Sequence, residues 1–316
     1  MNIILQLLHL LTSGDFWQLA LRDAALLSLP ALGGVISERS GVVNIAMEGM
    51  MLTGAFFAVV AALAWNNAFL AVLVAVLAGG LMALIHAVIS IRFNADQIIS
   101  GFAINIAAIG LTTFLNAKLS NFQGLPQVSS GGRLPVVNIP VLSDIPFFGE
   151  VLFQQNIIVY VALALLVVVN VVLFRTRLGR RLRAVGEHPQ AADTAGINVY
   201  RLRYGAVIVS GLLSGLAGAF LSIGIANIFN DNMTGGRGYI ALAAMIFGKW
   251  TPWGAFVACV IFGLGDALGA SSSALSVPLY FLHMAPDVLV LIVLAGLVGR
   301  STPPAADGIP YTPEGE

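Results

Sequence analysis

Two polar residues that are four positions apart, Asn44 and Glu48, interrupt a mostly apolar stretch of the sequence. Residues at this spacing lie on one face of a helix, so a carboxamide and a carboxylate would point in the same direction. Gly41 and Gly49 flank the pair, and glycine lets a helix break at such a place. The two groups could accept and donate hydrogen bonds to the hydroxyls of a ribose or to a base. The alternative is that they satisfy the backbone of the broken helix and brace its neighbours.

Three further polar residues, Asn105, Asp266 and Asp287, also lie in apolar stretches. An ionisable residue inside a membrane span is a functional candidate by default, because a charge in lipid is costly. We therefore add these residues to Asn44 and Glu48 as candidates for a solute pathway. Each also has a structural explanation: a hydrogen bond between helices for Asn105, contact with water at the end of a span for Asp266, and the positive end of a helix for Asp287.

The composition explains why these stretches are treated as membrane spans. Of the 316 residues, 58% are hydrophobic and only 9% are charged, whereas a soluble domain usually carries about 25% charged residues. The excess apolar surface must face lipid. We therefore expect an all-α integral membrane protein, a polytopic helical bundle of transmembrane or re-entrant helices.

A helix needs roughly 20 apolar residues to cross a bilayer core, and this length predicts about nine spans. The seventh span is short, so we expect it to be tilted or re-entrant. The predicted spans are Phe16–Ile36, Val42–Ala64, Phe69–Ile91, Ile98–Lys118, Ile157–Phe174, Tyr204–Ile225, Tyr239–Gly248, Trp253–Leu268 and Pro286–Val298. Inside the sixth, Gly211, Gly215 and Gly218 repeat at spacings of four and three, which lets helices approach closely in lipid.

The arginines predict the orientation of the chain. Residues 175–203 contain seven arginines, so this segment is expected in the cytoplasm. Residues 119–155 then form a long external loop, with the N-terminus outside and the C-terminus inside. We expect residues 1–300 to form a single transmembrane domain and the proline-rich residues 301–316 to form a disordered cytoplasmic tail.

A short helix is predicted within the arginine-rich segment. Pro189 suits the first position of a helix and Gly196 suits the residue just past its end; three alanines lie between them. A helix of about two turns is marginal alone in water, so it needs a partner surface. The alternative is an ordinary connector whose arginines only fix the topology.

Residues 183–198 resemble the coupling-helix motif of the permease subunits of ATP-binding-cassette (ABC) importers, in the branch that serves simple sugars, branched-chain amino acids and nucleosides. Other stretches are similar to that family as well: residues 37–51, residues 96–105, Gly-Tyr-Ile-Ala-Leu-Ala-Ala-Met-Ile-Phe-Gly at 238–248 and the tail at 303–311. The pattern from Asn44 to Glu48 looks most like nucleoside permeases. One departure is Pro286-Asp287, where relatives commonly have Pro-Tyr, and it weakens any substrate assignment through that region.

The resemblance implies a transmembrane permease subunit that forms half of the translocation pathway for nucleosides, or for a related sugar-like solute. The expected partners are a second permease that is a different homologue, a cytoplasmic ABC ATPase, a substrate-binding lipoprotein or periplasmic protein, and the lipid bilayer of a bacterial plasma (inner) membrane; nucleic acid is not expected. The residues implied to contact the ATPase are Gly186, Glu187, Pro189, Ala192, Asp193, Ala195 and Gly196.

Several chemistries are not expected. The phosphate loop of nucleotide-hydrolysing proteins ends in Gly-Lys-Ser/Thr, but the only Gly-Lys pair here, Gly248-Lys249, precedes a tryptophan. We therefore expect no enzyme activity, with ATP hydrolysis in a partner. Cys259 is the only cysteine, and His86 and His283 are isolated, so neither a metal site nor a cofactor is expected.

Two other functions stay open at this point. The chain could be a stand-alone ion-coupled secondary transporter that uses Glu48, Asp266 or Asp287 as a proton or cation relay. It could also be a passive channel. Dependence on partner proteins distinguishes both from the permease.

Overall fold

A computed structural model describes residues 10–121, 123–140, 142–271, 288 and 301–313. Within these residues, seven helices are long and apolar enough to cross a membrane, which confirms the all-α membrane class. The predicted short seventh span corresponds to a helix of 11 residues. The predicted span Pro286–Val298 and Asp287 lie outside the described residues.

The long helices are α2 (Gly14–Glu38), α3 (Met47–Trp65), α4 (Ala68–Ala87) with the π-helical η1 (Val88–Arg92), α5 (Gln97–Leu119), α6 (Ile157–Arg175), α9 (Val199–Ala219) with the π-helical η4 (Phe220–Ala226), and α11 (Pro252–Ala270). The shorter helices are α7 (Arg177–Glu187), α8 (Pro189–Thr194) and α10 (Arg237–Phe247). The segment between α5 and α6 contains η2 (Ser130–Gly132), β1 (Val136–Asn138), η3 (Gly149–Phe153) and β2 (Gln154–Asn156).

Short polar side chains cap the beginnings of most long helices; α3, which follows Ala46, has no such cap. Asp96 accepts from the backbone N–H groups of Ile98 and Ile99 at the start of α5, at 2.8 and 2.9 Å. Asn67, Asn156 and Asn198 cap α4, α6 and α9 in the same way. Such caps satisfy N–H groups that have no partner inside the helix, so the sequence itself fixes where these helices begin.

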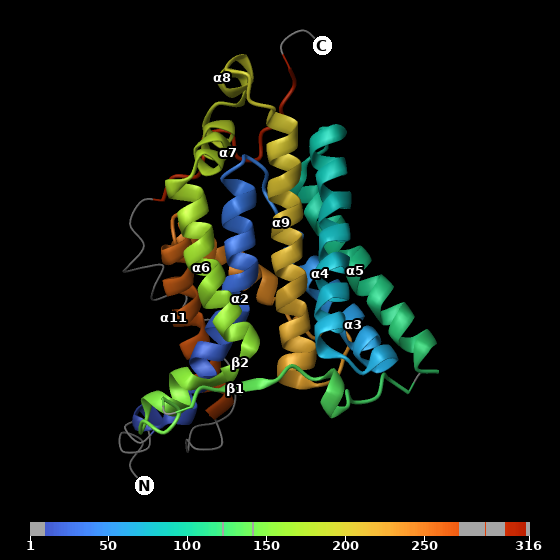
Figure 1. Cartoon of the computed structure of the whole chain (residues 1–316). Helices are drawn as coiled ribbons and strands as arrows, with labels where there is room; N and C mark the ends of the chain where they lie inside the picture. Colours follow the sequence, from blue (N-terminus) through green and yellow to red (C-terminus); the bar gives the residue numbers. More distant parts are fainter. Residues whose placement is uncertain (1–9, 122, 141, 272–287, 289–300, 314–316) are drawn as a thin grey trace.

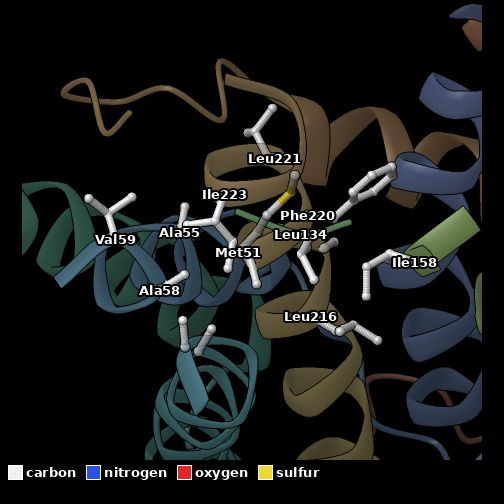
Figure 2. Close-up of a cluster of buried hydrophobic side chains, with 14 of the residues drawn as sticks. Met51, Ala55, Ala58, Val59, Leu134, Ile158, Leu216, Phe220, Leu221 and Ile223 are labelled. Atoms are coloured by element: carbon white, nitrogen blue, oxygen red, sulfur yellow. The ribbon is translucent and has the colours of Figure 1, made fainter. Parts of the chain in front are cut away.

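Helices α3, α4 and α9 pack with their backbones in close approach. A Cβ atom added at Gly54 would lie 2.6 Å from Gly215 Cα, and one added at Gly79 would lie 2.4 Å from the Gly211 carbonyl oxygen. The glycine spacing therefore marks a helix contact, as predicted. Figure 2 shows the apolar side chains around this contact, where Met51 and Ala55 of α3 belong to one cluster with Phe220 of η4.

The two predicted loops lie at opposite ends of the bundle (Figure 1). Strands β1 and β2 pair in antiparallel register, with Val137 opposite Gln155, across one end. Helices α7 and α8 and residues 301–313 lie at the other end. The spatial separation of the loops agrees with the predicted topology, while the side that faces the cytoplasm stays a prediction.

Residues 301–313 pack against the bundle, which differs from the predicted disorder. The backbone N–H of Ala306 donates to the Gly186 carbonyl at 2.9 Å, and Arg203 Nη1 donates to the Ile309 carbonyl at 3.0 Å. Tyr311 is only 3% exposed. The proline content predicted a flexible tail, but one buried aromatic ring and long-range hydrogen bonds hold it in place.

Candidate translocation and coupling sites

The predicted break before α3 is present, and Asn105 of α5 bridges it. Residues 42–46 are not helical. The Asn105 Oδ1 atom accepts from the Gly49 N–H at 2.7 Å, and its Nδ2 atom donates to the Ile45 carbonyl at 3.0 Å. Asn105 thus satisfies backbone groups that the break leaves without helical partners.

Glu48 binds the start of α10. Its Oε1 atom accepts from the Thr234 hydroxyl at 2.6 Å and from the Gly236 N–H at 2.9 Å, and its Oε2 atom accepts from the Gly238 N–H at 2.6 Å. The N-cap residue of α10, Gly236, has a φ of +87° and supplies no side-chain cap. A carboxylate from another helix therefore caps α10 and lies at its positive end.

Asn44 is bound to α9, whereas Glu48 is bound to the start of α10. Its Nδ2 atom donates to the Ser210 hydroxyl of α9 at 2.8 Å, and its Oδ1 atom has no hydrogen-bond partner in the described part of the chain. Asn44, Glu48 and Asn105 are all at most 3% exposed. The structure therefore brings Glu48 and Asn105 together around the break, and directs all three side chains at protein groups.

A polar loop, residues 227–236, connects η4 to α10 along the side of α5. Near the end of α5, the Asn116 Nδ2 atom donates to Asp231 Oδ1 at 2.9 Å. Eleven residues earlier in α5 (116 − 105), Asn105 donates to the Tyr239 hydroxyl at 2.9 Å. At a rise of 1.5 Å per residue these contacts are about 16 Å apart along the helix. The loop thus descends from the end of α5 toward its middle.

The polar loop carries exposed polar side chains at Asn230, Asp231 and Asn232. Non-helical backbone within a bilayer is tolerated only where protein buries it or where it lines a water-filled cavity. The exposed polar groups favour the second condition. The surface shared by the polar loop, the start of α10 and α5 is therefore the candidate translocation surface.

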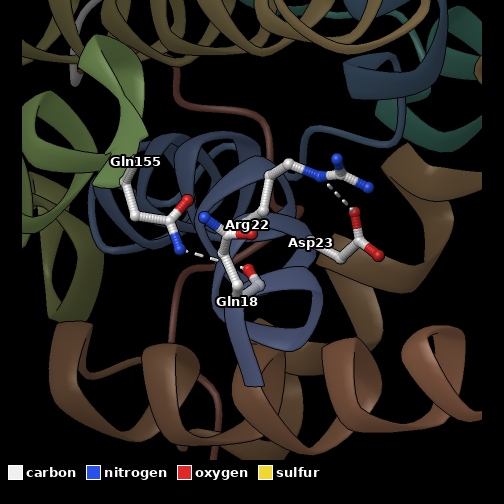
Figure 3. Close-up of polar contacts among 4 residues, drawn as sticks. All are labelled: Gln18, Arg22, Asp23 and Gln155. Atoms are coloured by element: carbon white, nitrogen blue, oxygen red, sulfur yellow. Dashed lines mark hydrogen bonds and ion pairs between the residues drawn. The ribbon is translucent and has the colours of Figure 1, made fainter. Parts of the chain in front are cut away.

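A cavity of about 370 Å³ lies between the start of α10, α2, η4 and α11. The Arg22 Nε atom lies 3.7 Å from Asp23 Oδ1 (Figure 3). Gln155 Nε2 donates to the Gln18 carbonyl at 3.2 Å, which joins the β2 strand to α2 (Figure 3). The charged residues that line the cavity are Arg22, Asp23, Arg237 and Asp266. Of these four residues, only Asp266 was predicted from the sequence as a candidate for the solute pathway. The fold brings the other three to the same cavity.

The short helix predicted within the arginine-rich segment is present as α8. Pro189 occupies its first turn, and Gly196 follows it with a φ of +79°. Pro189 and Ala192 are buried, and Ala192 belongs to a small apolar cluster with Val185, Val199 and Tyr311. The helix is therefore anchored on the bundle by one face, and its other face is exposed.

Of the other five residues predicted to contact the ATPase, one is buried and four are exposed. Gly186 is buried and accepts from the tail. Glu187 is exposed but accepts from the Ala305 N–H at 3.2 Å. Asp193, Ala195 and Gly196 are exposed. The surface open to another protein is therefore formed by the exposed members rather than by all seven predicted residues.

Residues 18–299 match a protein family described as the branched-chain amino acid transport system / permease component. The guanosine ABC transporter permease protein NupQ of Bacillus subtilis is 44% identical over 91% of this chain and 93% of that protein. The nucleoside ABC transporter permease protein NupC of Lactococcus lactis is 41% identical over 89% of this chain and 91% of that protein. The guanosine ABC transporter permease protein NupP of B. subtilis is also similar, with 26% identity over 85% of this chain and 76% of that protein.

This chain belongs to that permease family. The family match and the seven apolar helices make the permease a multi-pass membrane protein. Sequence reasoning missed Tyr239 and Arg237, although both lie in or next to the stretch that carried the family resemblance. Their positions at the start of α10 become informative only once Glu48 and Asn105 are seen to hold that helix.

Proposed function

We propose that the permease forms half of the translocation pathway of an ABC importer for nucleosides. The observation that carries this proposal is the candidate translocation surface, where exposed polar residues descend beside α5 to the start of α10. The nucleoside as solute is supported by the two most similar relatives described above, whose names refer to guanosine and nucleosides.

In this proposal Glu48 and Asn105 position α10 and Tyr239 at the pathway, and Asn44 fastens the preceding segment to α9. Asp266 contributes to the charged cavity between α10, α2, η4 and α11. Asp287 remains a candidate from the sequence. Weak contacts suffice for a permease that receives solute from a binding protein, because tight binding would slow release.

The partners follow from the same proposal. The guanosine transporter of B. subtilis has two permease proteins, NupQ and NupP, so we expect the second permease here to be a different homologue. We propose that the ATPase binds α7 and the exposed face of α8, and that the binding protein docks at the end with β1 and β2. Residues 175–203 and the tail would then be cytoplasmic, and residues 119–155 external.

Reconstitution in proteoliposomes tests this function. The permease, its second permease and the ATPase should take up guanosine only when ATP and the binding protein are present. An ATPase whose phosphate-loop lysine is replaced provides the matched control. Uptake by this chain alone, driven by an ion gradient, would instead support a secondary transporter. Uptake of glucose or ribose but of no nucleoside would support the sugar-like solute.

A further inference from the structure

We infer that Phe102 and Tyr239 form the part of the pathway that contacts the base of a nucleoside, an inference that rests on the proposed function. Phe102 lies on α5 and Tyr239 on α10, and their ring centroids are 6.3 Å apart with an interplanar angle of 34°. The two residues are 48% and 38% exposed. Two helices therefore present neighbouring aromatic faces on the candidate translocation surface.

Tyr239 is held in place by Asn105, which bridges the helix break, and by Glu48, which caps α10. Its hydroxyl accepts from Asn105 Nδ2, and Glu48 accepts from the N–H of the adjacent Gly238. Asn105 and Glu48 are buried and hydrogen-bonded to backbone groups. The tyrosine ring is thus fixed in place, while its hydroxyl retains its own proton to donate to a ligand.

The depth of Tyr239 argues against contact with lipid. Asn105 is the ninth of the 23 residues of α5 (105 − 97 + 1), about 12 Å from the beginning of that helix. Tyrosine prefers the two membrane–water interfaces, where its hydroxyl reaches water. A half-exposed tyrosine near the middle of a span, next to the start of α10, is better explained by an aqueous cavity.

The chemistry of the pair suits a base more than a sugar. A base has a flat π face that stacks on aromatic side chains, and this contact tolerates different bases. The Tyr239 hydroxyl could donate to a ring nitrogen or a carbonyl oxygen of the base. A free sugar has no such face, and a purine offers a larger face than a pyrimidine. The pair should therefore favour purine nucleosides over pyrimidine nucleosides and over free sugars.

The test measures competitive uptake of guanosine and uridine, below saturation, by the complete reconstituted transporter. Phe102→Leu and Tyr239→Leu remove the aromatic face but keep an apolar side chain of similar length. Each should lower guanosine uptake about tenfold, because stacking contacts of this kind are typically worth that factor, and should lower uridine uptake less. Phe102→Trp enlarges the face and should raise the guanosine-to-uridine ratio.

Phe114→Leu is the matched control, because Phe114 is also exposed on α5 (62%) but lies 12 residues away (114 − 102); it should leave the ratio unchanged. The inference is overturned if the leucine variants leave the ratio at the wild-type value. If the leucine variants do not assemble, an unchanged ratio in Phe102→Trp overturns it equally. A wild-type complex that moves no nucleoside would contradict the proposed function instead.

Discussion

Helices α10 and α8, the second of which we propose to bind the ATPase, are both too short to span a membrane, but they are held in different ways. At α10 a buried carboxylate accepts three hydrogen bonds from the polar loop and the first turn. At α8 a small apolar cluster and the tail anchor one face, and the other face is exposed. A buried polar network is costly to disrupt, whereas a small apolar contact at the surface separates more easily. This contrast agrees with the proposed function, in which α10 stays fixed at the pathway and α8 moves with the ATPase.

Glu48→Ala should have the largest effect on stability. It leaves three donors without an acceptor inside the bundle, and each unsatisfied buried group costs about 1–3 kcal/mol. We expect the free energy of unfolding in detergent to fall by at least about 3 kcal/mol, with loss of uptake. Glu187→Ala, at the coupling end, is the control and should change stability little. Equal effects of the two variants would remove the distinction between the two ends.

Tyr311→Ala should release the tail from the coupling end. The Tyr311 ring is buried against Tyr200, with centroids 5.5 Å apart. Deleting a buried aromatic ring costs about 3–5 kcal/mol in a full core, so about 2 kcal/mol is reasonable for this small cluster. Limited proteolysis should then cut residues 301–313 faster. Ile309→Ala, at a position that is 53% exposed, should not have this effect; protection of the Tyr311→Ala tail would show that hydrogen bonds alone hold it.

The docking of the tail should weaken as the pH rises. Burial raises the pKa of the Asp307 carboxyl group from its ordinary 3.8 to about 7, while nearby Glu38 and Arg203 oppose the rise. The docked tail thus binds a proton more tightly than the released tail. Docking is strongest below about pH 4, weakens through pH 7, and levels off above it. Hydrogen exchange of the Ala306 amide, corrected for its intrinsic rate, should be faster at pH 8 than at pH 6.

Asp307→Asn is the control for this pH dependence. An amide does not titrate in this range, so exchange of the Ala306 amide, corrected for its intrinsic rate, should no longer change between pH 6 and 8. The same pH dependence in the variant would assign the effect to another group.

Glu187→Arg should have the smallest effect on stability. Substitutions of exposed residues usually change it by less than about 0.5 kcal/mol. In the proposed function, however, this charge reversal should weaken binding of the ATPase and uncouple ATP hydrolysis from uptake. Glu150→Arg is the matched control, because Glu150 is exposed and lies in η3, directly before β2 at the opposite end of the bundle. Equal loss of ATPase binding in both variants would argue against docking on α8.

The sequence by itself determined most of the segments that are long and apolar enough to cross a membrane, and where several helices begin and end. These properties depend on local features: hydropathy over about 20 residues, capping side chains within three positions, such as Asp96, and the pair of Pro189 and Gly196 around α8. The repeat at Gly211 and Gly215 also indicated a close helix contact.

Only the tertiary structure decided what the polar residues contact. Glu48 accepts from Gly238, which is 190 positions away along the chain, and Asn105 bonds Tyr239 at a separation of 134. The tail packs beside α7 although its composition predicted disorder. Local patterns cannot specify such pairs, because they form only when packing removes both partners from water and leaves each as the other's available hydrogen-bonding group.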